Sequence, residues 1–88
     1  MQIDKPKWDL KIICPHCEQG FPTFVSCPNC GYLTVQCNET GDTFLNPNNL
    51  TDGFVDICPN CNKIGTDKFI IADSEDILKA GFTKDEYE

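Results

Sequence analysis

The chain has 88 residues, of which 40% are hydrophobic, and it carries a formal net charge of −7 at pH 7. A chain this short buries too small a share of its surface for a secure hydrophobic core, so a further stabilising element is expected. All seven basic residues are lysines and they face 14 acidic ones. This balance disfavours binding to nucleic acid or to an anionic membrane, because both require a basic face.

The N-terminal residues 1–13 contain no continuous apolar run of the kind that forms a signal peptide or a membrane span. We therefore expect a cytoplasmic protein, in which cysteines stay reduced. The chain has seven cysteines, and an odd number also argues against a closed set of disulfides. We expect one domain over residues 1–88, with an N-terminal arm (1–13), a metal-binding ribbon (14–72) and a C-terminal helix with its tail (73–88).

Short apolar runs alternate with turn-forming segments along most of the chain, which predicts β-hairpins. Polar, glycine-containing segments at residues 38–42 and 46–53 predict a turn and a longer loop. The predicted strands or strand ends lie at residues 11–13, 24–26, 32–37, 54–57 and 69–72.

The C-terminal part of the sequence predicts one short helix. Asp73 or Ser74 is a suitable N-cap, and the helix is expected to end near residues 79–81. Ile77 and Leu78 are expected to pack this helix on the ribbon.

Three aromatic or terminal features complete the predicted packing. Phe82 is expected to fold back after the glycine that ends the helix, and residues 83–88 are expected to fray. Trp8 is expected to anchor the N-terminal arm on the sheet, because tryptophan buries a large apolar area.

A Cys-Pro-x-Cys motif occurs three times, at residues 14–17, 27–30 and 58–61. Two cysteines at this spacing can direct both sulfurs at one point while the proline pre-sets the turn between them. Two such units facing each other form a tetrahedral four-thiolate site. The first motif, CPHC, also matches a thioredoxin-type redox dithiol, but residues 18–22 that follow cannot continue a helix as that site requires.

The stretch from Cys27 onward resembles zinc ribbons and rubredoxins. The resemblance lies in CPNCGY at residues 27–32, a Gly-Asp turn at residues 41–42 and CPNC at residues 58–61. It implies that Cys27, Cys30, Cys58 and Cys61 ligate one zinc or iron ion in a small, metal-stabilised, β-rich domain.

The chain also departs from rubredoxins. Asn62 stands where they carry glycine, residues 54–55 replace a tryptophan, and an additional N-terminal motif is present. These departures disfavour iron and electron transfer.

The remaining cysteines admit a second site. If residues 27–30 form the turn of a hairpin, residue 37 lies opposite about residue 20, which brings Cys37 toward Cys14 and Cys17. The fourth ligand of this second site is then open between His16, Glu39, Asp42 and water, and the chain holds two zinc ions in all.

A different pairing is also consistent with the spacing. Cys14, Cys17, Cys27 and Cys30 form a compact double motif, which leaves Cys58 and Cys61 with Cys37 as a third candidate. Cys37 alternates in phase with Leu33 and Val35, so it is equally a candidate core residue.

These patterns predict a non-enzymatic protein with structural zinc that contacts another protein. A single histidine and the lack of a phosphate-binding or Ser-His-Asp pattern argue against catalysis. Two alternatives are a rubredoxin-like iron electron carrier, with iron at Cys27, Cys30, Cys58 and Cys61, and a nucleic-acid-binding ribbon. The ribbon alternative uses Lys63, Lys68, Tyr32 and Phe24.

Overall fold

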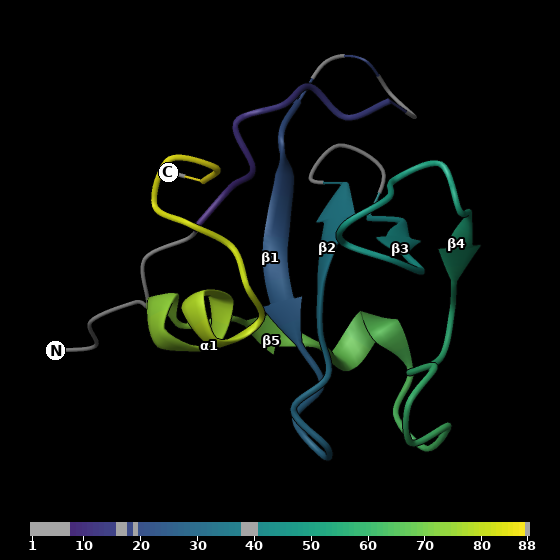
Figure 1. The fold of residues 1–88 in the computed structure, drawn as a ribbon. Helices are drawn as coiled ribbons and strands as arrows, with labels where there is room; N and C mark the ends of the chain where they lie inside the picture. The colour runs from purple at the N-terminus through teal and green to yellow at the C-terminus, as the bar shows by residue number, and fades with distance from the viewer. Residues whose placement is uncertain (1–7, 16–17, 19, 38–40, 88) are drawn as a thin grey trace, which may run out of the picture.

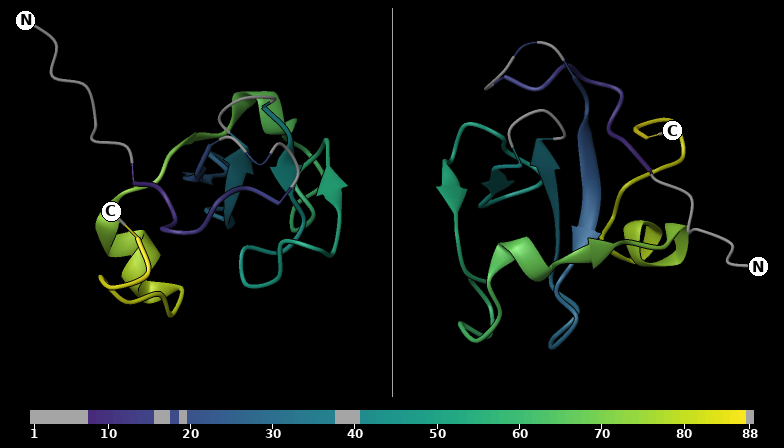
Figure 2. Two further views of the ribbon diagram at one scale, coloured as in Figure 1. Left: turned by 90° about the horizontal axis from the view of Figure 1, so that it is seen from above. Right: turned by 180° about the vertical axis from the view of Figure 1, so that it is seen from behind.

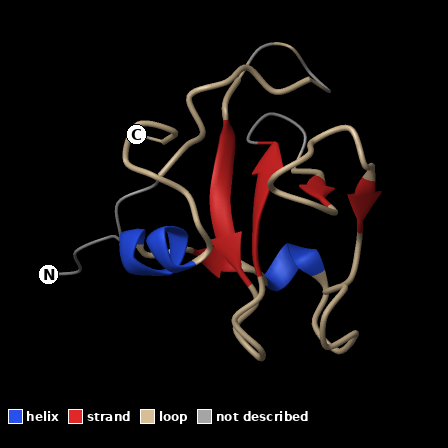
Figure 3. Ribbon diagram, viewed as in Figure 1, coloured by secondary structure: helices blue, strands red, loops and turns tan. Residues whose placement is uncertain are grey.

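The structure, a computed structural model, describes residues 8–15, 18, 20–37 and 41–87. Within these ranges the chain forms a small β-rich domain with a five-stranded antiparallel sheet in the order β4-β3-β2-β1-β5 and one short α-helix (Figures 1 and 3). The elements are β1 (Pro22–Ser26), β2 (Leu33–Cys37), β3 (Thr43–Phe44), β4 (Phe54–Val55), a 3₁₀ turn (Thr66–Lys68), β5 (Ile70–Ile71) and α1 (Ser74–Lys79).

The hairpin of β1 and β2 forms the centre of the sheet and confirms the strands predicted there. Its register pairs Ser26 with Leu33 and Pro22 with Cys37. The prediction that residue 37 lies opposite about residue 20 is therefore wrong by two positions. The reason is that the turn is longer than the Cys-Pro-Asn-Cys unit alone and closes only at Tyr32, whose carbonyl accepts from the N–H of Cys27 at 2.9 Å.

Apolar side chains from both chain ends pack against the middle of β1. The ring of Phe24 lies 5.0 Å from that of Phe82 and 5.7 Å from that of Tyr87, in edge-to-face geometry. Trp8 packs edge-on against Tyr87, as expected of an anchor. Figure 2 shows α1 and the C-terminal segment lying beside the same strand.

The C-terminal tail is not frayed, contrary to the prediction. Tyr87 is 3% exposed and bridges to Leu10, while the N–H of Lys11 donates to the carbonyl of Glu86 at 3.0 Å. Because edge-to-face aromatic pairs add to the area that Tyr87 buries, one ring suffices to hold an otherwise polar segment in place.

Two further predictions fail on the details of packing. Helix α1 has the predicted bounds and buries Ile77, but Leu78 is exposed because adjacent helical residues point about 100° apart. Residues 11–13 form no strand: Ile12 and Ile13 are exposed, and the arm makes its bridges earlier, at Asp9 and Leu10. No helix in the described ranges is long and apolar enough to cross a membrane.

Candidate metal centre

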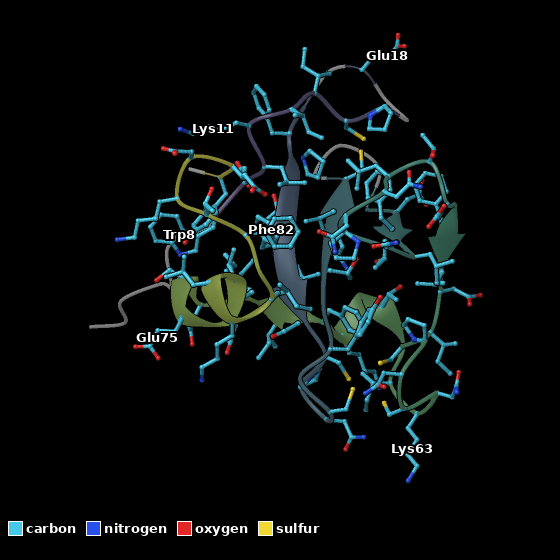
Figure 4. All side chains as sticks on the ribbon, in the orientation of Figure 1. Trp8, Lys11, Glu18, Lys63, Glu75 and Phe82 are labelled. Carbon is cyan, nitrogen blue, oxygen red and sulfur yellow. The ribbon has the colours of Figure 1, made fainter. Side chains whose placement is uncertain are left out.

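Two Cys-Pro-Asn-Cys turns lie side by side at one end of the sheet. The first, residues 27–30, connects β1 to β2, and the second, residues 58–61, lies between β4 and the 3₁₀ turn. The bridge between Ile57 and Gly65 closes the base of the second turn. Figure 1 shows both loops extending below the sheet, and Figure 4 shows their sulfur atoms gathered near the labelled Lys63.

Both turns are closed by two backbone hydrogen bonds of their first cysteine, and the second turn is one residue longer than the first. The carbonyl of Cys27 accepts from the N–H of Gly31, and the carbonyl of Cys58 accepts from the N–H of Asn62, each at 2.9 Å. The N–H of Cys58 donates in turn to the carbonyl of Ile64 at 2.8 Å, as that of Cys27 does to Tyr32. The fourth residue after each first cysteine has positive φ, 80° at Gly31 and 57° at Asn62, which lets the chain reverse after the second cysteine. We call a turn with these bonds a knuckle turn.

The four sulfurs of the two turns converge on one point. All four lie within 4.8 Å of one another. The Sγ atoms of Cys27 and Cys61 are 3.8 Å apart, and those of Cys30 and Cys58 are 3.5 Å apart. A tetrahedral site with Zn–S bonds of about 2.3 Å has sulfurs about 3.8 Å apart, so this donor set fits a tetrahedral metal ion. It is the one group of three or more metal-ligating residues within the described ranges.

The two cysteines of each turn differ in environment. Cys27 and Cys58 are buried, whereas Cys30 is exposed and Cys61 is partly buried. Burial raises the pKa of the Cys58 thiol to about 11. A buried sulfur of this kind needs a cation beside it to become a thiolate, and a bound metal supplies that charge.

Each asparagine hydrogen-bonds to the outer cysteine of the other turn. The hydrogen bond from the Asn29 side chain, together with one from the Lys63 backbone, lowers the pKa of Cys61 to about 6. Asn60 lowers the pKa of Cys30 in the same way. The two identical CPNC sequences thus form a reciprocal pair, in which the hydrogen bonds of Asn29 and Asn60 favour the thiolate forms of the outer cysteines.

The structure resolves which cysteine motifs pair. Cys27 and Cys30 join Cys58 and Cys61, so the alternative of Cys14, Cys17, Cys27 and Cys30 in one site is wrong. It fails because β1 lies between the two motifs in the chain and runs the length of the sheet. Cys14 and the turn at residues 27–30 therefore lie at opposite ends of the sheet (Figure 1). Cys17 and His16 lie outside the described residues, as does Glu39.

Sequence reasoning missed the roles of Asn29 and Asn60. The signal was present, because both turns carry asparagine at the same position of the motif. Its meaning depended on knowing that these two turns face each other.

A scan against protein-family models, a search of curated proteins and a search of solved structures found no match. The four-cysteine cluster itself is therefore the basis of the functional argument.

Proposed function

We propose that this chain is a zinc-binding protein in which one Zn²⁺, ligated by Cys27, Cys30, Cys58 and Cys61, has a structural role. The observation that supports this is the convergence of four sulfurs from two matched turns, at separations that suit a tetrahedral ion. Four protein thiolates fill the coordination sphere and leave no position for a substrate, as in structural zinc sites.

The sheet needs such a support. Strands β3, β4 and β5 have two residues each, and β5 pairs with β1 through two residue pairs. Strands this short contribute little by themselves. A structural zinc site supplies about 10–16 kcal/mol of apparent binding free energy, which becomes folding free energy when the site exists only in the folded chain.

Elemental analysis of purified protein, with a visible spectrum of the same sample, tests the choice of metal. We expect zinc and a colourless solution. Stoichiometric iron with a thiolate-to-iron charge-transfer band would replace this proposal with the rubredoxin-like electron carrier.

We propose further that the protein is not an enzyme, is cytoplasmic and contacts another protein next to the zinc site. Reduced thiols, which the site requires, are typical of the cytoplasm. Strand β4 is an edge of the sheet, and the side chains of Phe54 in this strand and of Ile57, two residues after it, are 43% and 41% exposed. An exposed sheet edge with apolar side chains favours pairing with another chain.

A photo-crosslinking amino acid at position 57 tests this contact in cells. Leu78 is a matched control because it is 43% exposed but lies on α1, away from the zinc site. We expect a discrete adduct from position 57 and none from position 78. Equal labelling from both positions would contradict a specific contact beside β4.

A further inference from the structure

The backbone pattern of the knuckle turn occurs at two more cysteines. At Cys14, the N–H donates to the carbonyl of Gly20 at 2.7 Å, and the carbonyl accepts from the N–H of Glu18 at 2.8 Å. At Cys37, the N–H donates to the carbonyl of Asp42 and the carbonyl accepts from the N–H of Gly41, both at 2.8 Å. Four cysteines therefore begin knuckle turns, although only three Cys-Pro-x-Cys motifs are visible in the sequence.

The φ angles of these turns support the match. The fourth residue after the cysteine has φ of 57° at Glu18 and 79° at Gly41, as it has at Asn62 and Gly31 in the metal centre. Within the described ranges, Glu18 and Asn62 are the two non-glycine residues with positive φ, and both occupy this position. Glutamate rarely adopts this conformation, so a specific turn must impose it.

The topology brings the two additional turns to one end of the sheet. The chain crosses the sheet along β1 and returns along β2, so the turns at Cys14 and Cys37 lie at the end opposite to the turn at Cys27 (Figure 1). The turns at Cys27 and Cys58 meet at one end, and those at Cys14 and Cys37 lie at the other. Cys37 pairs with Pro22 across the hairpin. The N–H of Cys14 donates to the carbonyl of Gly20, two residues before Pro22.

The two cysteines also share an environment. Cys14 is 0% exposed and Cys37 is 1% exposed, and both belong to one cluster of buried residues. In the metal centre the first cysteine of each turn is buried in the same way. Cys14 and Cys37 thus occupy the positions that Cys27 and Cys58 occupy in the metal centre.

We propose that the knuckle turns at Cys14 and Cys37 form a second metal site, selective for a thiophilic divalent cation such as Zn²⁺. The sequence supplies Cys17 as a third ligand, because it follows Cys14 as Cys30 follows Cys27. At the matching position after Cys37 the sequence has Thr40 instead of cysteine. The roles of Cys17 and Thr40 are inferred from the sequence alone, since both residues lie outside the described ranges.

This site differs chemically from the first one. Three thiolates leave the fourth position of a tetrahedral ion to a non-thiolate donor, such as water. The second ion is therefore held by fewer thiolates and is expected to exchange with chelators before the first. The inference goes beyond the structural zinc proposed above and does not depend on which metal the first site holds.

Metal counting by elemental analysis separates the two sites. We expect two zinc equivalents in the wild-type chain and one in the variant Cys14→Ser. One equivalent in both the wild type and Cys14→Ser would overturn the second site and leave the first intact. Absence of bound metal from the wild type would overturn both.

The variant Thr40→Cys tests the match between turns without removing a buried side chain. It restores the fourth thiol at the position equivalent to Cys30 and Cys61. We expect the more labile zinc to transfer to a chromophoric chelator at least tenfold more slowly, because a fourth thiolate then holds it. Glu39→Cys is the control, since it adds a thiol one position away. Equal transfer rates in Thr40→Cys, Glu39→Cys and the wild type would overturn the proposed site.

Discussion

The metal centre and the aromatic core stabilise this small domain in different ways. The metal centre, residues 27–32 and 58–64, has exposed or partly exposed side chains at most positions and is organised by converging sulfurs. The aromatic core, formed around β1 by Phe24, Phe82 and Tyr87, is organised by ring packing. Phe82 is labelled in Figure 4. The comparison teaches that hydrophobic burial supports one region of the sheet, whereas the other has little buried apolar area and instead brings together four sulfurs that could hold a metal ion.

The largest expected effect is loss of the metal centre. We expect Cys58→Ser to unfold the domain, because the lost zinc binding, about 10–16 kcal/mol, is comparable with the whole stability of a small protein. Trp8 is the only tryptophan and packs in the aromatic core, so its emission reports on that region. A red shift of this emission in Cys58→Ser is the expected result. Native emission from the variant would show that the aromatic core folds without the metal centre.

The aromatic core gives the next largest effect. Phe24 is 0% exposed and contacts both Phe82 and Tyr87. We expect Phe24→Ala to lower the free energy of unfolding by about 3–5 kcal/mol through lost burial and a residual cavity. Phe21→Ala, at a side chain that is 44% exposed, is the control, with an expected change under about 1 kcal/mol. Denaturant titration of zinc-loaded protein measures both, and similar losses would contradict the packing described.

These two regions also show what the sequence predicts well. Features set by neighbouring residues were predictable: the Cys-Pro-x-Cys turns, the strands of the central hairpin and the helix from Ser74. The motif that faces the turn at Cys27 was not predictable, because the spacings allowed two pairings. The course of β1 along the sheet decides between them. Tyr87 was missed because a single aromatic residue in a polar tail produces no periodic pattern.

A turn was predicted at residues 38–42, but its likeness to the Cys-Pro-x-Cys turns was missed for a similar reason. Its sequence, CNETGD, lacks both the proline and the second cysteine, so the motif is incomplete while the backbone pattern persists. Strand β3 has two residues, which is too short for an alternating pattern to be recognised.

The reciprocal asparagines give a smaller effect confined to the metal centre. We expect Asn29→Ala to weaken zinc binding by about tenfold, since a hydrogen bond to a charged group contributes about 1.5–3 kcal/mol and part of this is recovered from water. Asn60→Ala should act alike, because it occupies the equivalent position. Asn48→Ala in the exposed loop is the control. Chelator competition measures the affinities, and an unchanged affinity in both variants would show that these hydrogen bonds do not support the thiolates.

The smallest expected effect compares the two knuckle turns whose positive φ falls on a residue other than glycine. Both Glu18 and Asn62 have φ of 57°. Asparagine tolerates this conformation better than glutamate, whose longer side chain lacks a compensating local hydrogen bond. We expect Glu18→Gly to raise the free energy of unfolding by up to about 1 kcal/mol, and Asn62→Gly to raise it by less. Thermal unfolding of the two variants and the wild type measures which substitution stabilises the domain more. Destabilisation by Glu18→Gly would mean that residue 18 does not hold positive φ, and the match between the two ends of the sheet would then fail at that turn.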